Sequence, residues 1–328
     1  MRALIWLTVL LAGLYGGYWF VGSRAVLKGA ETALIQLKAD GRADYSNVEL
    51  AGFPSRFDVT ISDPKLVSAD GLESWTAPFL QLFALSYRPN HIIAVWPHDQ
   101  TVTFGAQTFD IKSSDMRASV AFTAGLSLPL EHSELEGHDL ALSSNFGWSV
   151  LAEKLIFATR QSSLAPYSHE VAIVVTGLVP GDDLRRMVDP KGLQPKRVDE
   201  IRISAVPVFD RPIDRSAAVT PPQITGVRNI AAALAWGSMS LDAKGDLGRD
   251  DNGFAKGRIG ISAHSWREIY AMFVDAGLVR KEIAPTIENV LTELAKSSGE
   301  DNLMVLPLIF DGGRARLGPI PLGPAPRF

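Results

Sequence analysis

The chain opens on a long uncharged run, and the pattern of hydrophobic and polar positions changes where that run ends. From Ala3 to Gly22 the sequence reads ALIWLTVLLAGLYGGYWFVG, about twenty residues without a charge. At about 1.5 Å rise per residue, a helix of this length matches the hydrocarbon thickness of a bilayer, and its aromatic residues lie near the ends. The pattern predicts a transmembrane anchor over residues 1–22, through which the protein contacts a membrane.

A cleaved secretory signal is the alternative interpretation of this run. Val21 and Ser23 are small residues before a cut, but bulky Trp19 and Phe20 lie beside them, and the run exceeds the roughly 7 to 15 apolar residues of a signal. Long domains cross a membrane largely regardless of flanking charge. We therefore expect a single-pass protein of the bacterial inner membrane with the bulk of the chain in the periplasm, or secretion to the periplasm after cleavage.

Beyond the anchor the period of the hydrophobic pattern changes twice. Residues 23–44 have helical spacing and predict a helical stalk that ends near Gly41. From residue 45 to residue 208 the pattern alternates, as at Phe57, Val59 and Ile61, and such segments recur about every 8 to 12 residues. This pattern predicts a mainly β (α+β) fold: a large antiparallel, curved sheet or half-barrel with a few short helices.

Proline and charge interrupt this rhythm at residues 209–223, which predict a linker or a long surface loop. Residues 224–328 then predict a long hairpin, two helices and a terminal hairpin. In the long hairpin, Met239 and Leu241 share one face, and Ile259 and Ile261 share another. Ser265 begins the first helix with Glu268 three residues on, the spacing of a capping box. The second helix is predicted from Ala284 to Lys296.

Composition narrows the classes of function. The 328 residues include no cysteine, which excludes thiol catalysis and Cys-ligated metal clusters. A formal net charge of −4 implies no basic face, so nucleic acid is not expected as a partner. The sequence contains no P-loop, dinucleotide fingerprint, HExxH or GxSxG motif. We therefore expect no enzyme activity and no cofactor.

One set of residues is of the types that coordinate metal ions. His132, Glu134, Glu136 and His138 alternate along one predicted strand, so they share a face that could bind a divalent metal. The polar outer face of a sheet has the same pattern, and this spacing matches no standard metal site. We expect no metal here.

Arg56 lies on the polar side of an alternating strand, directly after a Gly-Phe-Pro turn. Its planar guanidinium could bind a lipid phosphate or an acidic partner. The alternative is that it pairs with a nearby carboxylate and fixes the turn.

Four segments, in order along the chain, resemble a known bacterial family. They are GFPSRFDV (Gly52 to Val59), the pair Trp75 and Pro78, SYRPNHIIAVWP (Ser86 to Pro97), and FDGGRARLGPIPLGPAPRF (Phe310 to Phe328). Together they are similar to the family known as domain of unknown function 2125. The resemblance implies an inner-membrane-anchored, periplasm-facing, β-rich protein with no assigned activity. The long hairpin, short helices and final hairpin also resemble AsmA-type envelope proteins, at the level of pattern alone.

Two functions remain open. An antiparallel sheet with one apolar face must cover that face, and the predicted helices are few and short. The first hypothesis is that the apolar face binds or passes lipid or another hydrophobic envelope molecule. The second is an envelope interaction or scaffold module that pairs its sheet edge with another protein. The residues predicted to contact a ligand or partner are Arg56, Phe57, Val59, Met239, Leu241, Ile259 and Ile261.

Overall fold

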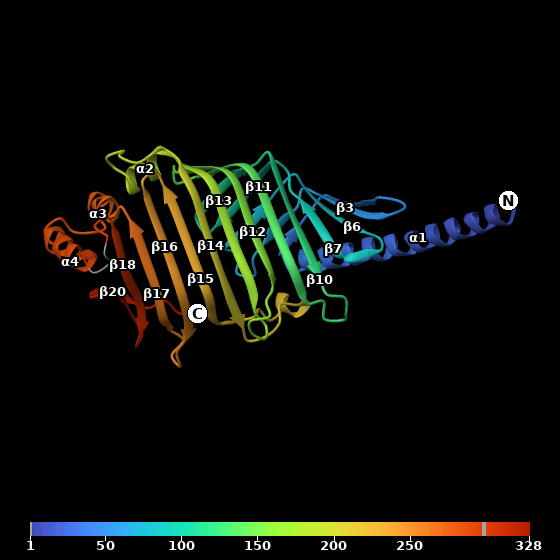
Figure 1. The fold of residues 1–328 in the computed structure, drawn as a ribbon. Helices are drawn as coiled ribbons and strands as arrows, with labels where there is room; N and C mark the ends of the chain where they lie inside the picture. The colour runs from blue at the N-terminus through green and yellow to red at the C-terminus, as the bar shows by residue number, and fades with distance from the viewer. Residues whose placement is uncertain (1, 297–299) are drawn as a thin grey trace.

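The structure, a computed structural model, describes residues 2–296 and 300–328, with the side chains of residues 5–217, 219–296 and 300–328. A helix, α1 (Arg2–Ala39), projects from one end of a large open antiparallel sheet (Figure 1). From Ile5 to Ala39 this helix is long and apolar enough to cross a membrane. The predicted mainly β fold is therefore confirmed. The helix does not end at Gly22 but continues unbroken through the residues predicted as a stalk.

The strands form one antiparallel sheet, in which the later strands pair in chain order while several of the earlier ones pair with strands farther along the chain. The first ten are β1 (Ala43–Asp44), β2 (Asn47–Ala51), β3 (Arg56–Ser62), β4 (Lys65–Val67), β5 (Glu73–Thr76), β6 (Phe79–Leu85), β7 (Arg88–Val95), β8 (Asp99–Phe104), β9 (Gln107–Lys112) and β10 (Asp115–Phe122). The others are β11 (Leu130–Ser144), β12 (Ser149–Gln161), β13 (His169–Pro180), β14 (Val198–Phe209), β15 (Ile224–Trp236), β16 (Met239–Arg249), β17 (Ala255–His264), β18 (Leu303–Asp311), β19 (Arg314–Leu317) and β20 (Ile320–Pro324).

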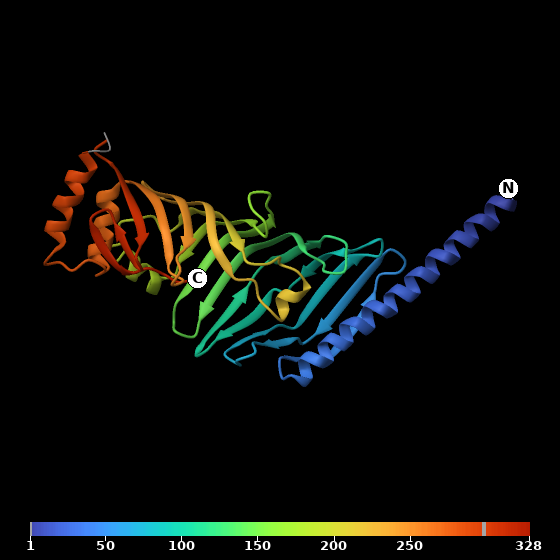
Figure 2. The same cartoon turned by 90° about the horizontal axis from the view of Figure 1, so that it is seen from below.

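The early strands come in collinear pairs, each a longer strand broken in the middle. β10 and β9 lie end to end along β11, with Asp115 opposite His138 and Lys112 opposite Ala141. Backbone hydrogen bonds continue across the break, as where the Asp63 amide donates to the Pro78 carbonyl at 2.9 Å. Asp63 and Asp139 have positive φ, which bends a strand without ending it. The result is one meander with a transverse crease (Figure 2).

The helix α1 packs against the first strands of the meander. Phe57 on β3 is buried, and its ring stacks on Trp19 with ring centroids 6.3 Å apart. A Cβ added to Gly22 would lie 2.9 Å from the Phe57 ring, so glycine permits this close approach. The helix therefore covers the apolar side of the sheet at this end.

Three further helices lie at the other end of the sheet (Figure 1): α2 (Asp182–Val188), α3 (Trp266–Asp275) and α4 (Ala284–Lys296). α4 has the predicted bounds. The capping box predicted for α3 is wrong. Ser265 is the N-cap, but its backbone is left-handed and its hydroxyl donates to the Ser238 carbonyl at 3.1 Å instead of capping the helix. Packing of the helix start against the β15–β16 turn decides this geometry.

Residues 210–223 connect two neighbouring strands of the sheet. β14 and β15 pair over most of their length, with Ile203 opposite Ala232 and Phe209 opposite Ile224. The segment includes a short 3-10 helix (Arg215–Ala218). The Leu130 amide of β11 donates to the Ile213 carbonyl of the segment at 2.8 Å, which fixes the segment against β11. The sheet therefore continues across this proline-rich segment.

His169, at the start of β13, gives the fold a pH dependence. Its side chain is buried, and burial lowers the pKa of its imidazole, because a charged ring loses hydration there. The unfolded chain binds a proton below about pH 6.5, so the free energy of unfolding is highest above that pH and falls as the pH drops toward the lowered folded pKa. We expect His169→Gln to flatten this decline in denaturant titrations at a series of pH values. Parallel curves for the two proteins would contradict this expectation.

Candidate ligand-binding groove

An unbroken ladder of apolar residues crosses the sheet from β3 to β18. Residues directly opposite in an antiparallel sheet share a face, so a chain of such pairs marks one line on that face. From one strand to the next, this line consists of Val59, Leu82, Ala94, Ala118, Leu135, Phe157, Ile173, Ile203, Ala232, Ala243, Ile261 and Leu306. We call this line the inner ladder, and its side of the sheet the inner face.

The inner ladder is covered at its ends and open in the middle. Val59, next to the strand edge that α1 covers, is buried, and Leu306 is buried in a cluster with Trp266, Tyr270 and Leu291 of the terminal helices. Between these ends Ala118 is also buried, but the ladder residues from Leu135 to Ile261 are partly buried or exposed, and Ile203 is 42% exposed. The middle of the inner face is therefore apolar and accessible.

The opposite face of the same strands is mixed, with charged residues among apolar ones such as Ile156 and Val174. The neighbouring ladder on that side places Arg117 opposite Glu136, and farther along it Arg202 and Asp242 each lie opposite Ala233. Alternation along each strand explains the difference, because successive side chains point to opposite faces. Of the two ladders, only the inner ladder is apolar along its whole course.

The polar strip predicted on β11 lies on this outer face. Glu136 contacts the ammonium of Lys154 and the ring of His138, which together hold the pKa of its carboxyl below the ordinary value. Lys154 lies on β12, and His138 lies on β11 itself. Within residues 2–296 and 300–328, no three His, Asp or Glu side chains are placed to hold a metal ion.

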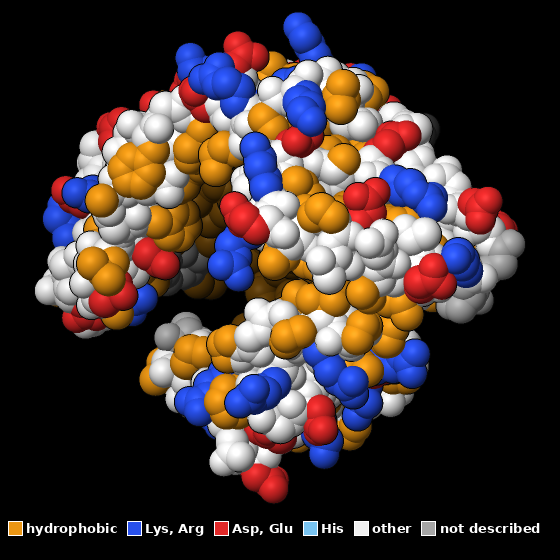
Figure 3. Space-filling view, turned by 90° about the vertical axis from the view of Figure 1, so that its left-hand side faces the viewer, with side chains coloured by type: hydrophobic (Ala, Val, Ile, Leu, Met, Phe, Trp, Pro, Cys, Tyr) orange, Lys and Arg blue, Asp and Glu red, His pale blue; other side chains and the backbone are white. Residues whose placement is uncertain are grey.

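An apolar cavity of about 500 Å³ lies between the sheet and the helices α2 and α3. Its floor includes Leu234, Met239 and Leu241, and its walls include Ile269 and Met272 of α3. Figure 3, which views the molecule from this end, shows a hollow lined by hydrophobic side chains. The accessible inner face therefore continues into a pocket beside the terminal helices.

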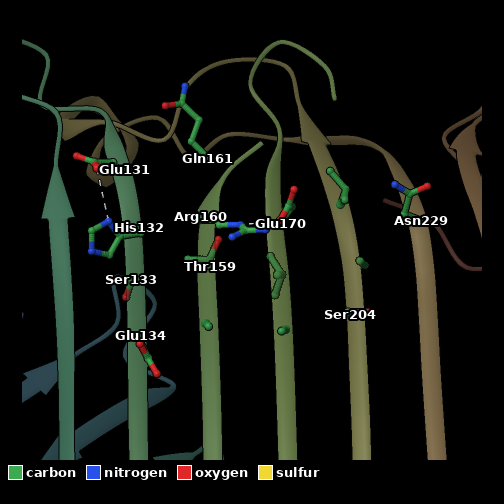
Figure 4. A pocket seen from close by; sticks show the side chains of 15 residues that line it. Glu131, His132, Ser133, Glu134, Thr159, Arg160, Gln161, Glu170, Ser204 and Asn229 are labelled. Carbon is green, nitrogen blue, oxygen red and sulfur yellow. Dashed lines mark hydrogen bonds and ion pairs between the residues drawn. The ribbon is translucent and has the colours of Figure 1, made fainter. Parts of the chain in front are cut away.

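A second hollow, of about 960 Å³, crosses β11 to β15 and includes charged side chains in its lining (Figure 4). Arg160 and Glu170 in its lining pair with each other, with Arg160 Nε 2.6 Å from Glu170 Oε2. His132 Nδ1 lies 3.8 Å from Glu131 Oε1. Because Arg160 and Glu170 are already paired with each other, this pair offers no free charge to a ligand.

The structure places the predicted contact residues in three environments. Phe57 and Val59 are on the inner face but buried, so a ligand does not reach them without movement, whereas Met239 is buried at the floor of the apolar cavity. Leu241, Ile259 and Ile261 are partly buried. Ile261 belongs to the inner ladder, Leu241 lines the cavity, and Ile259 packs against the cluster around Phe310.

Arg56 lies apart from the other predicted residues, on the outer face. Its guanidinium bonds Asp58 on the same strand, Nη2 to Oδ2 at 2.7 Å, and its backbone carbonyl accepts from Trp19 Nε1 at 2.8 Å. The geometry matches the alternative in which Arg56 pairs with a nearby carboxylate beside the turn. The side chain remains more than half exposed.

The sequence analysis missed the residues in the open middle of the inner ladder. The signal was present for Leu135 and Ile203, which lie between polar neighbours, but not for Phe157, which lies between Ile156 and Ala158. Only the strand register shows that they form one line with Val59 and Ile261.

The geometry defines a class of protein: an open antiparallel sheet with one apolar face, attached to a helix able to cross a membrane. The chain belongs to the bacterial family described as "Uncharacterized protein conserved in bacteria (DUF2125)", whose family model matches residues 19–326. This match confirms the predicted family. No curated protein and no solved structure matches the chain, so the likeness to AsmA-type proteins stays a prediction.

Proposed function

We propose that this protein is anchored in the bacterial inner membrane by α1 and that its inner face, in the periplasm, holds or passes lipid or another hydrophobic molecule. The observation that supports this function is the inner ladder, which has no polar member across its whole course. Burial of apolar surface is favourable by about 25 cal/mol per Å². A ligand with acyl chains would supply the cover that the middle of the ladder lacks.

The length of the inner ladder suits a ligand with long apolar chains. Neighbouring strands are about 4.8 Å apart, so the accessible part of the line, from β11 to β17, extends for about 29 Å. One leaflet of a bilayer contributes about half of its roughly 30 Å of hydrocarbon. The groove therefore has room for more than one lipid in a row, which fits passage as well as storage.

The scaffold alternative, in which the sheet edge pairs with another protein, has weaker support. One edge strand, β20, includes Pro321 and Pro324, and proline cannot donate to a new strand partner. The other edge, β1 and β2, lies against α1. Both edges are therefore poor templates for strand addition.

Photocrosslinking in living cells tests the proposed function. Benzoylphenylalanine at Phe157, on the inner ladder, should crosslink to lipid in bacteria grown with radioactive acetate, which labels acyl chains. The same probe at the adjacent Ile156, which points to the outer face opposite Glu136, is the matched control. Label on the protein should appear at position 157 and be several-fold weaker at position 156. Equal labelling at both positions, or none at either, would contradict the proposal.

A further inference from the structure

The body of the protein contacts α1 inside its uncharged stretch. Tyr18 donates its hydroxyl to the Ser86 carbonyl at 2.6 Å, and the Tyr15 hydroxyl lies 3.2 Å from Ser86 Oγ. Trp19 donates to the Arg56 carbonyl and packs edge-on against Phe53, with ring centroids 5.1 Å apart. The first charged residue after this stretch is Arg24. These contacts therefore lie within the span predicted to cross the bilayer.

Two turns of the sheet make these contacts, residues 52–55 between β2 and β3 and residues 86–87 between β6 and β7. We call them the turn pair. Tyr15 precedes Gly22 by seven residues, which is about 10 Å along a helix at 1.5 Å per residue. If α1 crosses the bilayer from Ala3 to Gly22, the turn pair reaches about that far into the leaflet on the side of the sheet.

The turn pair presents the side chains expected at such a depth. Phe53 is 65% exposed and Tyr87 is 63% exposed, although both are large and aromatic. Arg56 and Arg88 beside them are also exposed. Aromatic rings are enriched at the membrane interface, and arginine can extend its charge toward the headgroups.

Several backbone groups of the turn pair form hydrogen bonds within the protein. The Ser86 amide donates to the Ser55 carbonyl at 2.9 Å, and the Arg56 amide donates to the Gly52 carbonyl at 2.9 Å. The Ser86 and Arg56 carbonyls accept from Tyr18 and Trp19 of α1. In lipid, backbone polar groups must be satisfied within the protein, and these bonds meet that requirement for the groups that form them.

We propose that the turn pair is inserted in the membrane leaflet on the side of the sheet, where Phe53 and Tyr87 contact lipid. Phe57, which packs against Trp19, then begins the inner face of the sheet next to that leaflet. The apolar face would thus receive acyl chains directly from the membrane. This last consequence rests on the proposed lipid function, whereas insertion of the turn pair rests only on α1 crossing the bilayer.

Single-cysteine variants of the full chain test the insertion, because the native chain contains no cysteine. Phe53→Cys and Tyr87→Cys are labelled with the environment-sensitive dye NBD in nanodiscs of phosphatidylethanolamine and phosphatidylglycerol. Phe146→Cys is the matched control, since Phe146 is 64% exposed in the turn between β11 and β12. This turn lies at the opposite end of the strands from the turn pair. Leu10→Cys, in α1, reports on the anchor itself.

We expect lipids with a nitroxide on the acyl chain to quench the labels at positions 10, 53 and 87 roughly twofold or more beyond the label at position 146. Water-like emission at positions 53 and 87, with quenching at position 10, would overturn insertion and leave the anchor intact. Water-like emission at position 10 would overturn the anchor and the insertion together. The Ile203→Asp substitution, which tests the groove, should leave all these signals unchanged.

Discussion

Replacing Ile203 with aspartate is expected to lower the affinity for lipid by about 10- to 100-fold while the sheet remains folded, because burying an unpaired polar group costs about 1 to 3 kcal/mol. Ile203 lies in the middle of the inner ladder, between Ile173 and Ala232. Its side chain is accessible in the free protein, so the carboxylate stays hydrated until a ligand covers it. The measurement is binding of a pyrene-labelled phospholipid to the full chain in nanodiscs, with circular dichroism to verify the fold.

Val305→Asp is the matched control for this substitution. Val305 is 48% exposed, close to the 42% of Ile203, but lies on the outer face opposite Ser262. It should bind lipid like the unmodified protein. Equal loss in both variants, or normal binding by Ile203→Asp, would contradict the groove. Ile259 is a poorer position for this test, since it packs against a buried cluster and an aspartate there would disturb the fold itself.

Replacing Trp266 with alanine is expected to reduce the free energy of unfolding by about 3 to 5 kcal/mol, the range for large-to-small changes in a core. The indole is buried between α3, α4 and β18, in the cluster with Tyr270, Leu291 and Met304. Its Nε1 also donates to the Asp301 carbonyl at 3.3 Å. Truncation leaves a cavity at the end of the sheet that these helices cover, while the Asp301 carbonyl keeps its bond from Arg267 Nη1 at 2.9 Å. Urea titration of the full chain, followed by circular dichroism, measures the loss.

Phe273→Ala removes an aromatic ring from the same helix and is the control. Phe273 is half exposed at the rim of the apolar cavity, so its truncation should cost about 1 kcal/mol or less. Similar losses in the two variants would show that α3 is not held by the cluster around Trp266. A loss confined to Trp266→Ala would establish that the terminal helices are a fixed cover for this end of the inner face.

Local pattern predicted the elements well where the residues themselves decide the conformation. The uncharged run from Ala3 to Gly22 predicts an apolar helix, and the helical stripe around Leu291 predicts α4. Alternation at Phe57, Val59 and Ile61 identifies β3 and its buried face. Ser265 failed as a capping residue because its hydroxyl bonds a carbonyl on a distant turn, which no local motif reveals.

The candidate groove was predictable only in outline. Val59 and Ile261 were recognised as apolar positions in strands, but Val59 is buried whereas Ile261 is partly accessible. The open middle, around Phe157 and Ile203, was missed because burial depends on what lies above a face. The packing of α1 and of α3 and α4 at the ends of the sheet decides which inner-face residues stay uncovered.

The sequence by itself determined that this chain has an apolar N-terminal helix, many amphipathic strands, and an identifiable family. These properties follow from residue type and spacing within a few turns or strand repeats of the chain. The tertiary structure decided the register that aligns twelve apolar residues into one ladder, and the contact of Tyr18 in α1 with Ser86, 68 residues away. Register and cover arise from pairing between segments far apart in sequence, where one residue of shift would turn every side chain to the other face.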